Sequence, residues 1–228
     1  MSEKPLNQYG DVLFPTTGTH GGDIASQRLD DLDKESIRAV LALEDPRIAC
    51  IDLGCGFGWH GSRLAMLGAD VRTYDLLPES ILLRVLRENA QLQLVHCAGD
   101  LRRLKLQDLP ERVDQAFSQR FIHYLTYSEA QHLIQTVAKR CSPAASFYLS
   151  ASGLNSELGQ HYGGSSVEVC NRFSPLSPKM QSKHNIWEPV CLYTEADLTE
   201  LMASSGFVKC RVWKSAFGNI KGVFRKES

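Results

Sequence analysis

The octet Ile51-Asp-Leu-Gly-Cys-Gly-Phe-Gly58 is the stretch that decides the fold class of this chain. It ends a short apolar run over 48–53 that is typical of a buried strand, and a helical pattern over 59–67 follows it. Three glycines without a Cβ let the backbone turn sharply and let a ligand approach it closely. The octet therefore predicts a ligand site at the carboxyl end of a strand.

The spacing of these glycines and the neighbouring acid indicate which ligand the turn suits. A dinucleotide fold would use Gly-x-Gly-x-x-Gly, whereas here the third glycine comes one residue early and Trp59 takes the dinucleotide position. Asp52, at the end of the strand, would repel a pyrophosphate and favours a cation such as an amino group or a sulfonium. A nicotinamide-dependent reductase is the alternative that this spacing disfavours.

Apolar strand patterns alternate with helical patterns along the rest of the chain. Strands are expected over 69–74, 92–97, 113–118 and 146–151, and helices over 31–43, 79–90 and 128–140, the last with Ser128 as its cap. Thr194 and Asp197 predict a capping box for a further helix that ends at Gly206. Two closing strands, 207–213 and 220–224, are expected to pair antiparallel at a sheet edge. The alternation predicts a mostly parallel sheet with helices on both faces.

The octet resembles motif I of the class I S-adenosylmethionine-dependent methyltransferases, and the resemblance extends from about Ile48 to the carboxyl terminus. It implies a doubly wound α/β fold with a seven-stranded, mostly parallel sheet, an antiparallel last strand and helices on both faces. It also implies S-adenosyl-L-methionine as the cofactor, with the methyl group transferred by in-line displacement.

The resemblance places cofactor contacts at the ends of four strands. Asp75 ends the second strand, where a carboxylate can accept both ribose hydroxyls, although an exposed turn acid is the alternative. Asp100 is expected to bind the adenine amino group with Leu101 against the ring, although Gly-Asp also makes ordinary turns. Ser118 and Arg120 are expected beside the methionine part, and Arg120 could instead pair with a substrate carboxylate. The full cofactor set is Asp52, Gly54, Cys55, Gly56, Gly58, Asp75, Leu76, Asp100, Leu101, Ser118 and Arg120.

His123 and Tyr124 follow the fourth expected strand, beside the methyl group in this fold. They are the catalytic candidates, for substrate orientation or for proton removal, while a structural histidine at a helix start is the alternative. The Asn/Asp-Pro-Pro-Tyr signature is missing from this position, which argues against amide or adenine nitrogen as the acceptor.

The expected domain organisation points to a covered pocket. Residues 1–45 are expected to form an arm and a helix that act as a lid over the cofactor, and residues 46–228 the methyltransferase domain. Within it, the Gly-, Pro- and Ser-rich segment 152–190 is expected to cover a small-molecule acceptor. A methyltransferase acting on protein or RNA and a non-catalytic S-adenosylmethionine-binding protein are the alternatives.

Composition narrows the partners further. The 228 residues carry a formal net charge of -1, with 43% hydrophobic and 22% charged residues, which suits one globular domain and argues against nucleic acid as the main partner. Seven cysteines without a CxxC pair predict reduced thiols and no metal site. No signal peptide or membrane-spanning run is recognisable, so no membrane partner and a cytoplasmic location are expected.

Overall fold

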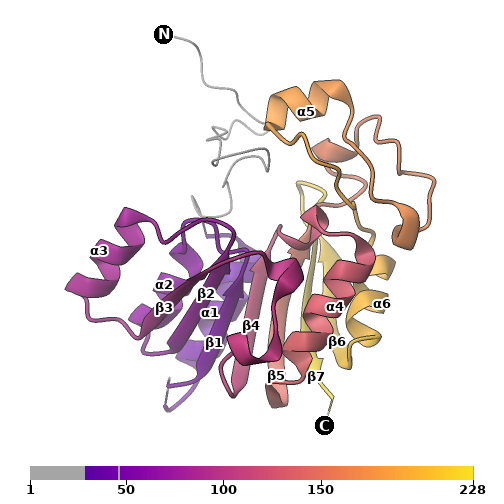
Figure 1. Ribbon diagram of the computed structural model, residues 1–228. Helices are drawn as coiled ribbons and strands as arrows, with labels where there is room; N and C mark the ends of the chain where they lie inside the picture. Colours follow the sequence, from indigo (N-terminus) through magenta and orange to yellow (C-terminus); the bar gives the residue numbers. More distant parts are fainter. Residues whose placement is uncertain (1–28, 46, 228) are drawn as a thin grey trace.

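A computed structural model describes residues 29–45 and 47–227, and it places all seven strands in one sheet (Figure 1). The strand order is β3-β2-β1-β4-β5-β7-β6, with β7 antiparallel to both of its neighbours and the other adjacent pairs parallel. This confirms the expected doubly wound α/β fold with an antiparallel last strand. The strands are β1 (Ala49–Leu53), β2 (Asp70–Asp75), β3 (Leu94–Ala98), β4 (Val113–Gln119), β5 (Cys141–Ala151), β6 (Phe207–Lys214) and β7 (Ile220–Lys226).

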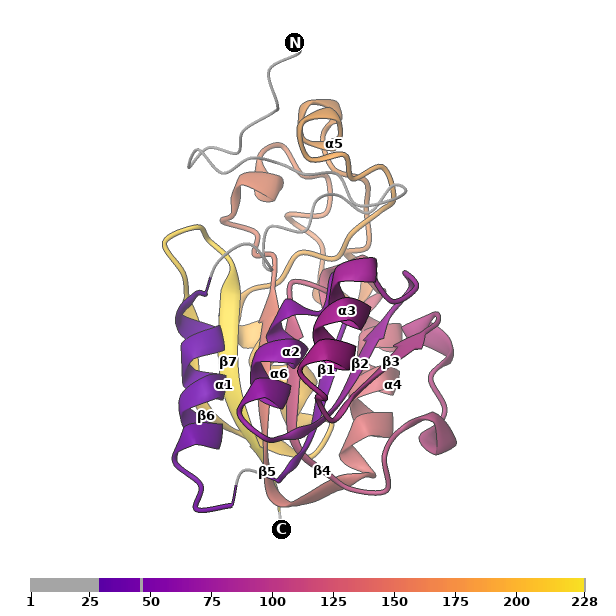
Figure 2. The same ribbon diagram turned by 90° about the vertical axis from the view of Figure 1, so that its left-hand side faces the viewer.

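Helices cover both faces of the sheet, as alternating strands and helices require (Figure 2). Ile51 and Leu53 of β1 belong to the apolar cluster that includes residues of α4 and α6, whereas Cys50, which precedes Ile51, packs with residues of α1, α2 and α3. The helices are α1 (Asp31–Leu41), α2 (Trp59–Met66), α3 (Ile81–Asn89), α4 (Tyr127–Ala138), α5 (Pro178–His184) and α6 (Glu195–Ala203). Single-turn 3-10 helices are η2 (Leu101–Arg103), η3 (Leu106–Asp108), η4 (Ile122–Tyr124), η5 (Glu157–Gly159) and η6 (Val169–Asn171).

Capping boxes set the starts of α4 and α6, which cover the face of the sheet opposite α1, α2 and α3. Thr194 and Asp197 cap α6 as expected, because each side chain accepts the other residue's backbone N–H. The expected cap of α4 at Ser128 is wrong, since Thr126 is the N-cap and forms a capping box with Glu129. An acid three residues after a threonine can satisfy the cap amide with a full charge, which the Gln131 that follows Ser128 cannot match.

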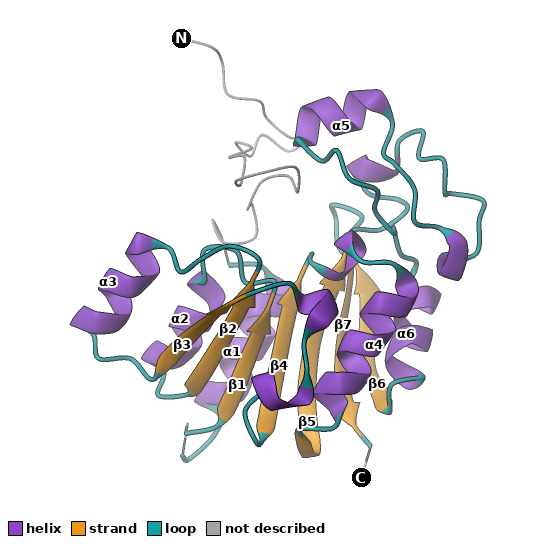
Figure 3. Cartoon of the chain, viewed as in Figure 1, coloured by secondary structure: helices purple, strands orange, loops and turns teal. Residues whose placement is uncertain are grey.

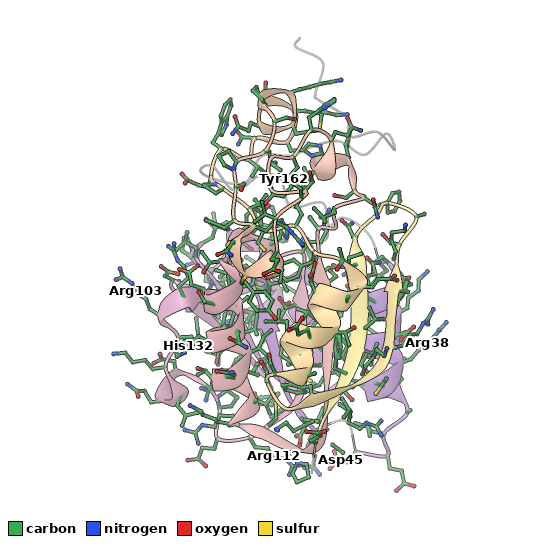
Figure 4. The ribbon with its side chains drawn as sticks, turned by 90° about the vertical axis from the view of Figure 1, so that its right-hand side faces the viewer. Arg38, Asp45, Arg103, Arg112, His132 and Tyr162 are labelled. Atoms are coloured by element: carbon green, nitrogen blue, oxygen red, sulfur yellow. The ribbon has the colours of Figure 1, made fainter. Side chains whose placement is uncertain are left out.

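The segment 152–190 forms a small unit of its own above the carboxyl ends of the parallel strands (Figure 3). Figure 4 shows Tyr162 of this unit at one end of the molecule, with Arg112 and Asp45, which precede β4 and β1, at the other. An apolar cluster holds the unit together, formed by Leu158, Tyr162, Leu176, Met180, Ile186, Val190 and Leu192. A sequence rich in glycine and proline therefore builds a local core here.

The expected lid falls mostly outside the described residues, which begin at Leu29; of the 1–45 segment, α1 packs against the sheet and α2. Across 29–45 and 47–227, no helix combines the length and apolar character needed to cross a lipid bilayer. Within the same ranges, no three His, Cys, Asp or Glu side chains gather as a metal site would require.

Candidate cofactor and acceptor site

The glycine turn after β1 is fixed by backbone hydrogen bonds and by a ring that packs on it. The amides of Gly54 and Cys55 both donate to the carbonyl oxygen of Tyr74, at 2.8 and 3.0 Å, which ties the turn to the end of β2. All three glycines have positive φ, +69°, +56° and +81°. A Cβ at Gly54 would lie 2.2 Å from Cγ of Phe121, so the turn requires glycine there for both conformation and space.

Asp52 anchors the helix that follows the turn. Its side chain is only 2% exposed, and Oδ2 accepts the Gly61 N–H of α2 at 3.1 Å. A buried carboxylate at the amino-terminal end of a helix is favourable, because the helix dipole is positive there. Asp52 thus sets the position of α2 against β1, directly beneath the glycine turn.

Asp75 joins the glycine turn to the loop after β2. Oδ2 accepts the Gly56 N–H at 2.8 Å and Oδ1 accepts the Leu77 N–H at 3.0 Å. An ionised carboxylate has about four acceptor positions, so these bonds are compatible with further hydroxyl donors. Leu76, beside it, is 58% exposed and offers an apolar surface at the same edge.

His96 of β3 supports this edge and was not predicted from the sequence. Nδ1 lies 3.0 Å from the hydroxyl oxygen of Thr73, and Nε2 lies 2.9 Å from the carbonyl oxygen of Leu77. Cys55 places its sulfur 3.9 Å from the same Nδ1. The only sequence signal was a histidine inside an otherwise apolar strand pattern.

Asp100 and Leu101 lie after β3, where the adenine was expected. Asp100 forms a two-point ion pair with Arg102, at 2.9 Å to Nε and 2.8 Å to Nη2, and these hydrogen bonds lower the pKa of its carboxyl group. Leu101 is buried in the main apolar cluster. The adenine contact stays a prediction, and any amino group bound by Asp100 would share its oxygens with Arg102.

The end of β4 holds Ser118 and Arg120 in different environments. Ser118 is fully buried, and its hydroxyl has no hydrogen-bond partner among the described residues. Arg120 adopts a positive φ of +50°. Its N–H donates to both the carbonyl oxygen and the hydroxyl oxygen of Ser150, at 2.9 and 3.0 Å, which makes Ser150 a second residue that sequence reasoning missed.

His123 lies in η4 and is only 2% exposed. Its Nδ1 is buried and has no hydrogen-bond partner within the described part of the chain. Burial, followed by the positive charge of Arg120, lowers the pKa of His123 to about 3. Its ring lies against that of Tyr124, with centroids 4.1 Å apart, so the two catalytic candidates pack together in η4.

Comparison with known sequences identifies the domain. Residues 51–149 match the sequence model of a family described as a methyltransferase domain, and this match runs from the glycine octet through β5. This segment therefore carries the methyltransferase domain that the family describes. No curated protein matches the chain in sequence.

Solved methyltransferases share the fold of this domain. The 1,6-didemethyltoxoflavin-N1-methyltransferase of Burkholderia thailandensis is 15% identical, with 90% of this chain and 80% of that chain covered and a TM-score of 0.65. Magnesium protoporphyrin IX methyltransferase of Synechocystis PCC 6803 is 17% identical, with 89% of this chain and 84% of that chain covered and a TM-score of 0.60. An S-adenosylmethionine-dependent methyltransferase of Mesorhizobium loti is 20% identical, with 86% of this chain and 98% of that chain covered and a TM-score of 0.62. At these identities the similarity concerns the fold.

Two contacts connect η4 to the insertion 152–190 and to the residue that directly follows it. The Cys191 N–H donates to the carbonyl oxygen of His123 at 2.8 Å, and Tyr124 packs against the apolar cluster of the insertion. Glu157 and His184 bring a charged group to the same region, with Glu157 Oε2 3.2 Å from His184 Nε2. Neither the contact through Cys191 nor the role of Glu157 was predicted, because both depend on how a long insertion folds back.

Proposed function

We propose that this methyltransferase domain transfers a methyl group from S-adenosylmethionine to a small-molecule acceptor. The observation that carries the proposal is the insertion 152–190, whose apolar cluster packs against Tyr124 of η4 and whose next residue, Cys191, donates its N–H to the carbonyl oxygen of His123 in η4. Such a cover suits a compact acceptor better than a protein or RNA surface. Proteins of similar fold are named for 1,6-didemethyltoxoflavin and magnesium protoporphyrin IX, which is consistent with this class of acceptor.

The residues at the carboxyl ends of β1 and β2 fit the methyl donor. The glycine turn, with the Phe121 ring packed on Gly54, permits a ligand to approach the backbone closely. Asp75 is hydrogen-bonded to the turn through Gly56, and its carboxylate can accept further hydrogen bonds from hydroxyl groups. Asp52, Cys55 and the other octet residues form the floor of the turn in the proposal. Asp100, Leu101 and Ser118 complete the proposed cofactor set, and Arg120 lies next to them as a partner for the carboxylate of either the cofactor or the acceptor.

The chain's task in such a reaction is alignment and exclusion of water. S-adenosylmethionine supplies a methyl group on a positively charged sulfur, whose departure leaves a neutral thioether. The protein then has to orient the acceptor atom in line with that methyl group. With a pKa of about 3, His123 is neutral at physiological pH and a weak proton acceptor, so its hydrogen-bonding atoms serve to orient the acceptor. Tyr124, whose ring is tilted by 40° against that of His123, is proposed to contact the acceptor beside it.

The amino-terminal segment completes the enclosure in this proposal. Asp30, the N-cap of α1, accepts a hydrogen bond from Gln119 at the carboxyl end of β4 at 2.6 Å. The chain therefore enters the described fold directly beside the proposed site. This position of Asp30 supports the proposal that residues 1–45 act as a lid over the cofactor.

The test is to incubate the purified chain with S-adenosylmethionine labelled in its methyl group and a cell extract, then to separate small molecules, protein and RNA. Label is expected in the small-molecule fraction and to disappear when excess S-adenosylhomocysteine is added. Label in protein or RNA would contradict the proposed acceptor class. Tight S-adenosylhomocysteine binding with no labelled product in any fraction would favour the non-catalytic alternative.

A further inference from the structure

We propose that the acceptor carries a carboxylate and that the guanidinium of Arg120 binds it where η4 meets the insertion, with His123 and His184 beside it. This inference rests on the proposed small-molecule function and names the substrate class for the same site. It assigns Arg120 to the acceptor instead of the methionine part of the cofactor.

The backbone of Arg120 is held in a conformation that arginine rarely adopts. A positive φ of +50° in a non-glycine residue costs about 1 kcal/mol, and such strain persists where the surroundings over-determine it. Here both oxygen atoms of Ser150 accept the Arg120 N–H. The hydrogen bonds to Ser150 thus hold the Arg120 backbone in a conformation that glycine or asparagine would adopt with less strain.

The charge of Arg120 has no ionic partner among residues 29–45 and 47–227, unlike that of Arg172. Arg172 is buried and donates to the carbonyl oxygens of Val167 and Leu192 and to the carboxylate of Asp197. No hydrogen bond or ion pair joins the Arg120 guanidinium to any described residue. Guanidinium groups that are partly buried are ordinarily paired, so Arg120 is ready for an anion from outside the protein.

The nearby acid Glu157 is paired with other cations and forms no ion pair with Arg120. Glu157, the acid on this side of the insertion, lies 2.5 Å from Lys183 Nζ and 3.2 Å from His184 Nε2. Arg120 is close enough to both histidines for its charge to act on them. In each case burial is the main cause of the lowered pKa, and the Arg120 charge adds to it.

His123 supplies the second observation, because Nδ1 is a buried polar atom without a partner among the described residues. Leaving such an atom unpaired costs about 1–3 kcal/mol, which a ligand oxygen or N–H would recover. A single guanidinium matches one carboxylate in both charge and planar two-point geometry. The neutral imidazole beside it can bind a further polar atom of the same molecule.

The experiment uses the full-length protein saturated with S-adenosylhomocysteine and three pairs of probes: benzoate and benzamide, phenylacetate and phenylacetamide, 3-phenylpropionate and its amide. Each pair has the same shape and differs in charge. We expect saturable binding of at least one acid by calorimetry and no binding of its amide. Arg120→Gln should weaken that acid about tenfold to a hundredfold and leave S-adenosylhomocysteine affinity unchanged. Arg38→Gln, exposed on α1 (Figure 4), is the matched control and should change neither.

Three results would overturn the inference: equal binding of acids and amides, no acid that binds saturably, or unchanged acid affinity in Arg120→Gln. A loss of S-adenosylhomocysteine affinity in Arg120→Gln would return the residue to the cofactor and also overturn it. All of these are separable from failure of the proposed function. Label in a neutral small molecule would sustain that function while refuting the carboxylate, whereas label in protein or RNA would refute the function itself.

Discussion

The two halves of the proposed site are built by different means. The half at β1 and β2 consists of a glycine turn and two acids. The carboxylate oxygens of these acids accept hydrogen bonds from nearby backbone N–H groups, as Asp75 does from Gly56. The half at η4 and the insertion consists of groups brought together from segments far apart in sequence, such as the Cys191 N–H and the carbonyl oxygen of His123. A donor shared by a whole family needs the first kind of construction, while an individual acceptor needs the second.

The strongest way to separate the halves is to break the buried pair of the insertion. Arg172→Met should cost about 3 kcal/mol of stability, because Asp197 and two carbonyls lose a buried donor. Amide hydrogen exchange should rise in 152–192, while S-adenosylhomocysteine binding persists. Arg112→Met, which removes an exposed ion pair with Asp114, is the control and should cost no more than about 1 kcal/mol. Equal losses in both variants would contradict the assigned role of Arg172.

The cofactor half is best broken at its turn. Gly54→Ala adds a Cβ 2.2 Å from the Phe121 ring at a φ of +69°, so we expect a loss of about 2–3 kcal/mol in urea unfolding and weakened S-adenosylhomocysteine binding. Gly99→Ala is the matched control, since its Cβ would meet no atom within 4 Å. If both variants bind S-adenosylhomocysteine like the parent, the turn does not hold the cofactor.

A milder change tests a single contact in the same half. Asp75→Asn keeps the size of the side chain and removes the charge, so S-adenosylhomocysteine affinity should fall about tenfold to a hundredfold by calorimetry. Asp70→Asn changes an exposed acid at the opposite end of β2 and should leave the affinity as it is. Unchanged affinity in Asp75→Asn would remove the ribose assignment.

The last prediction concerns the acceptor half and the pH dependence of stability. Because burial lowers the pKa of His123 from 6.5 to about 3, the unfolded chain binds a proton below pH 6.5 that the folded chain refuses. Stability should therefore fall as pH drops from 6.5 towards 3, by at most about 1.4 kcal/mol per pH unit from this residue. His123→Asn should flatten the urea-unfolding curve against pH, whereas His132→Asn, exposed on α4 (Figure 4), should not. Parallel curves for the parent and His123→Asn would refute a neutral, buried imidazole.

Much of the fold was predictable because its signals are local. The octet, the period of the apolar residues and the Thr194–Asp197 capping box each depend on neighbours in sequence, and the structure has them where they were expected. The start of α4 was misplaced by the same reasoning, since two overlapping cap patterns competed and the acidic one prevailed. Two residues, Thr126 and Glu129, decide that start.

Within the site, the predicted residues differ in how far the sequence could describe them. Asp52 and Asp75 were expected at strand ends and lie there, although both are already hydrogen-bonded to backbone amides. His96, Ser150 and Glu157 were missed, because nothing in a strand or loop pattern reveals which distant atom a polar side chain will meet. Their partners lie across the sheet or in the insertion.

By itself the sequence determined the layered architecture, the glycine turn and the donor class, because backbone conformation and apolar periodicity are encoded over a few neighbouring residues. Only the tertiary structure decided that Phe121 packs on Gly54, that His123 is buried and neutral, and that Arg172 pairs with Asp197 while Arg120 meets no acid in the described part of the chain. Burial and charge pairing depend on segments far apart in the chain, and folding alone brings those segments together.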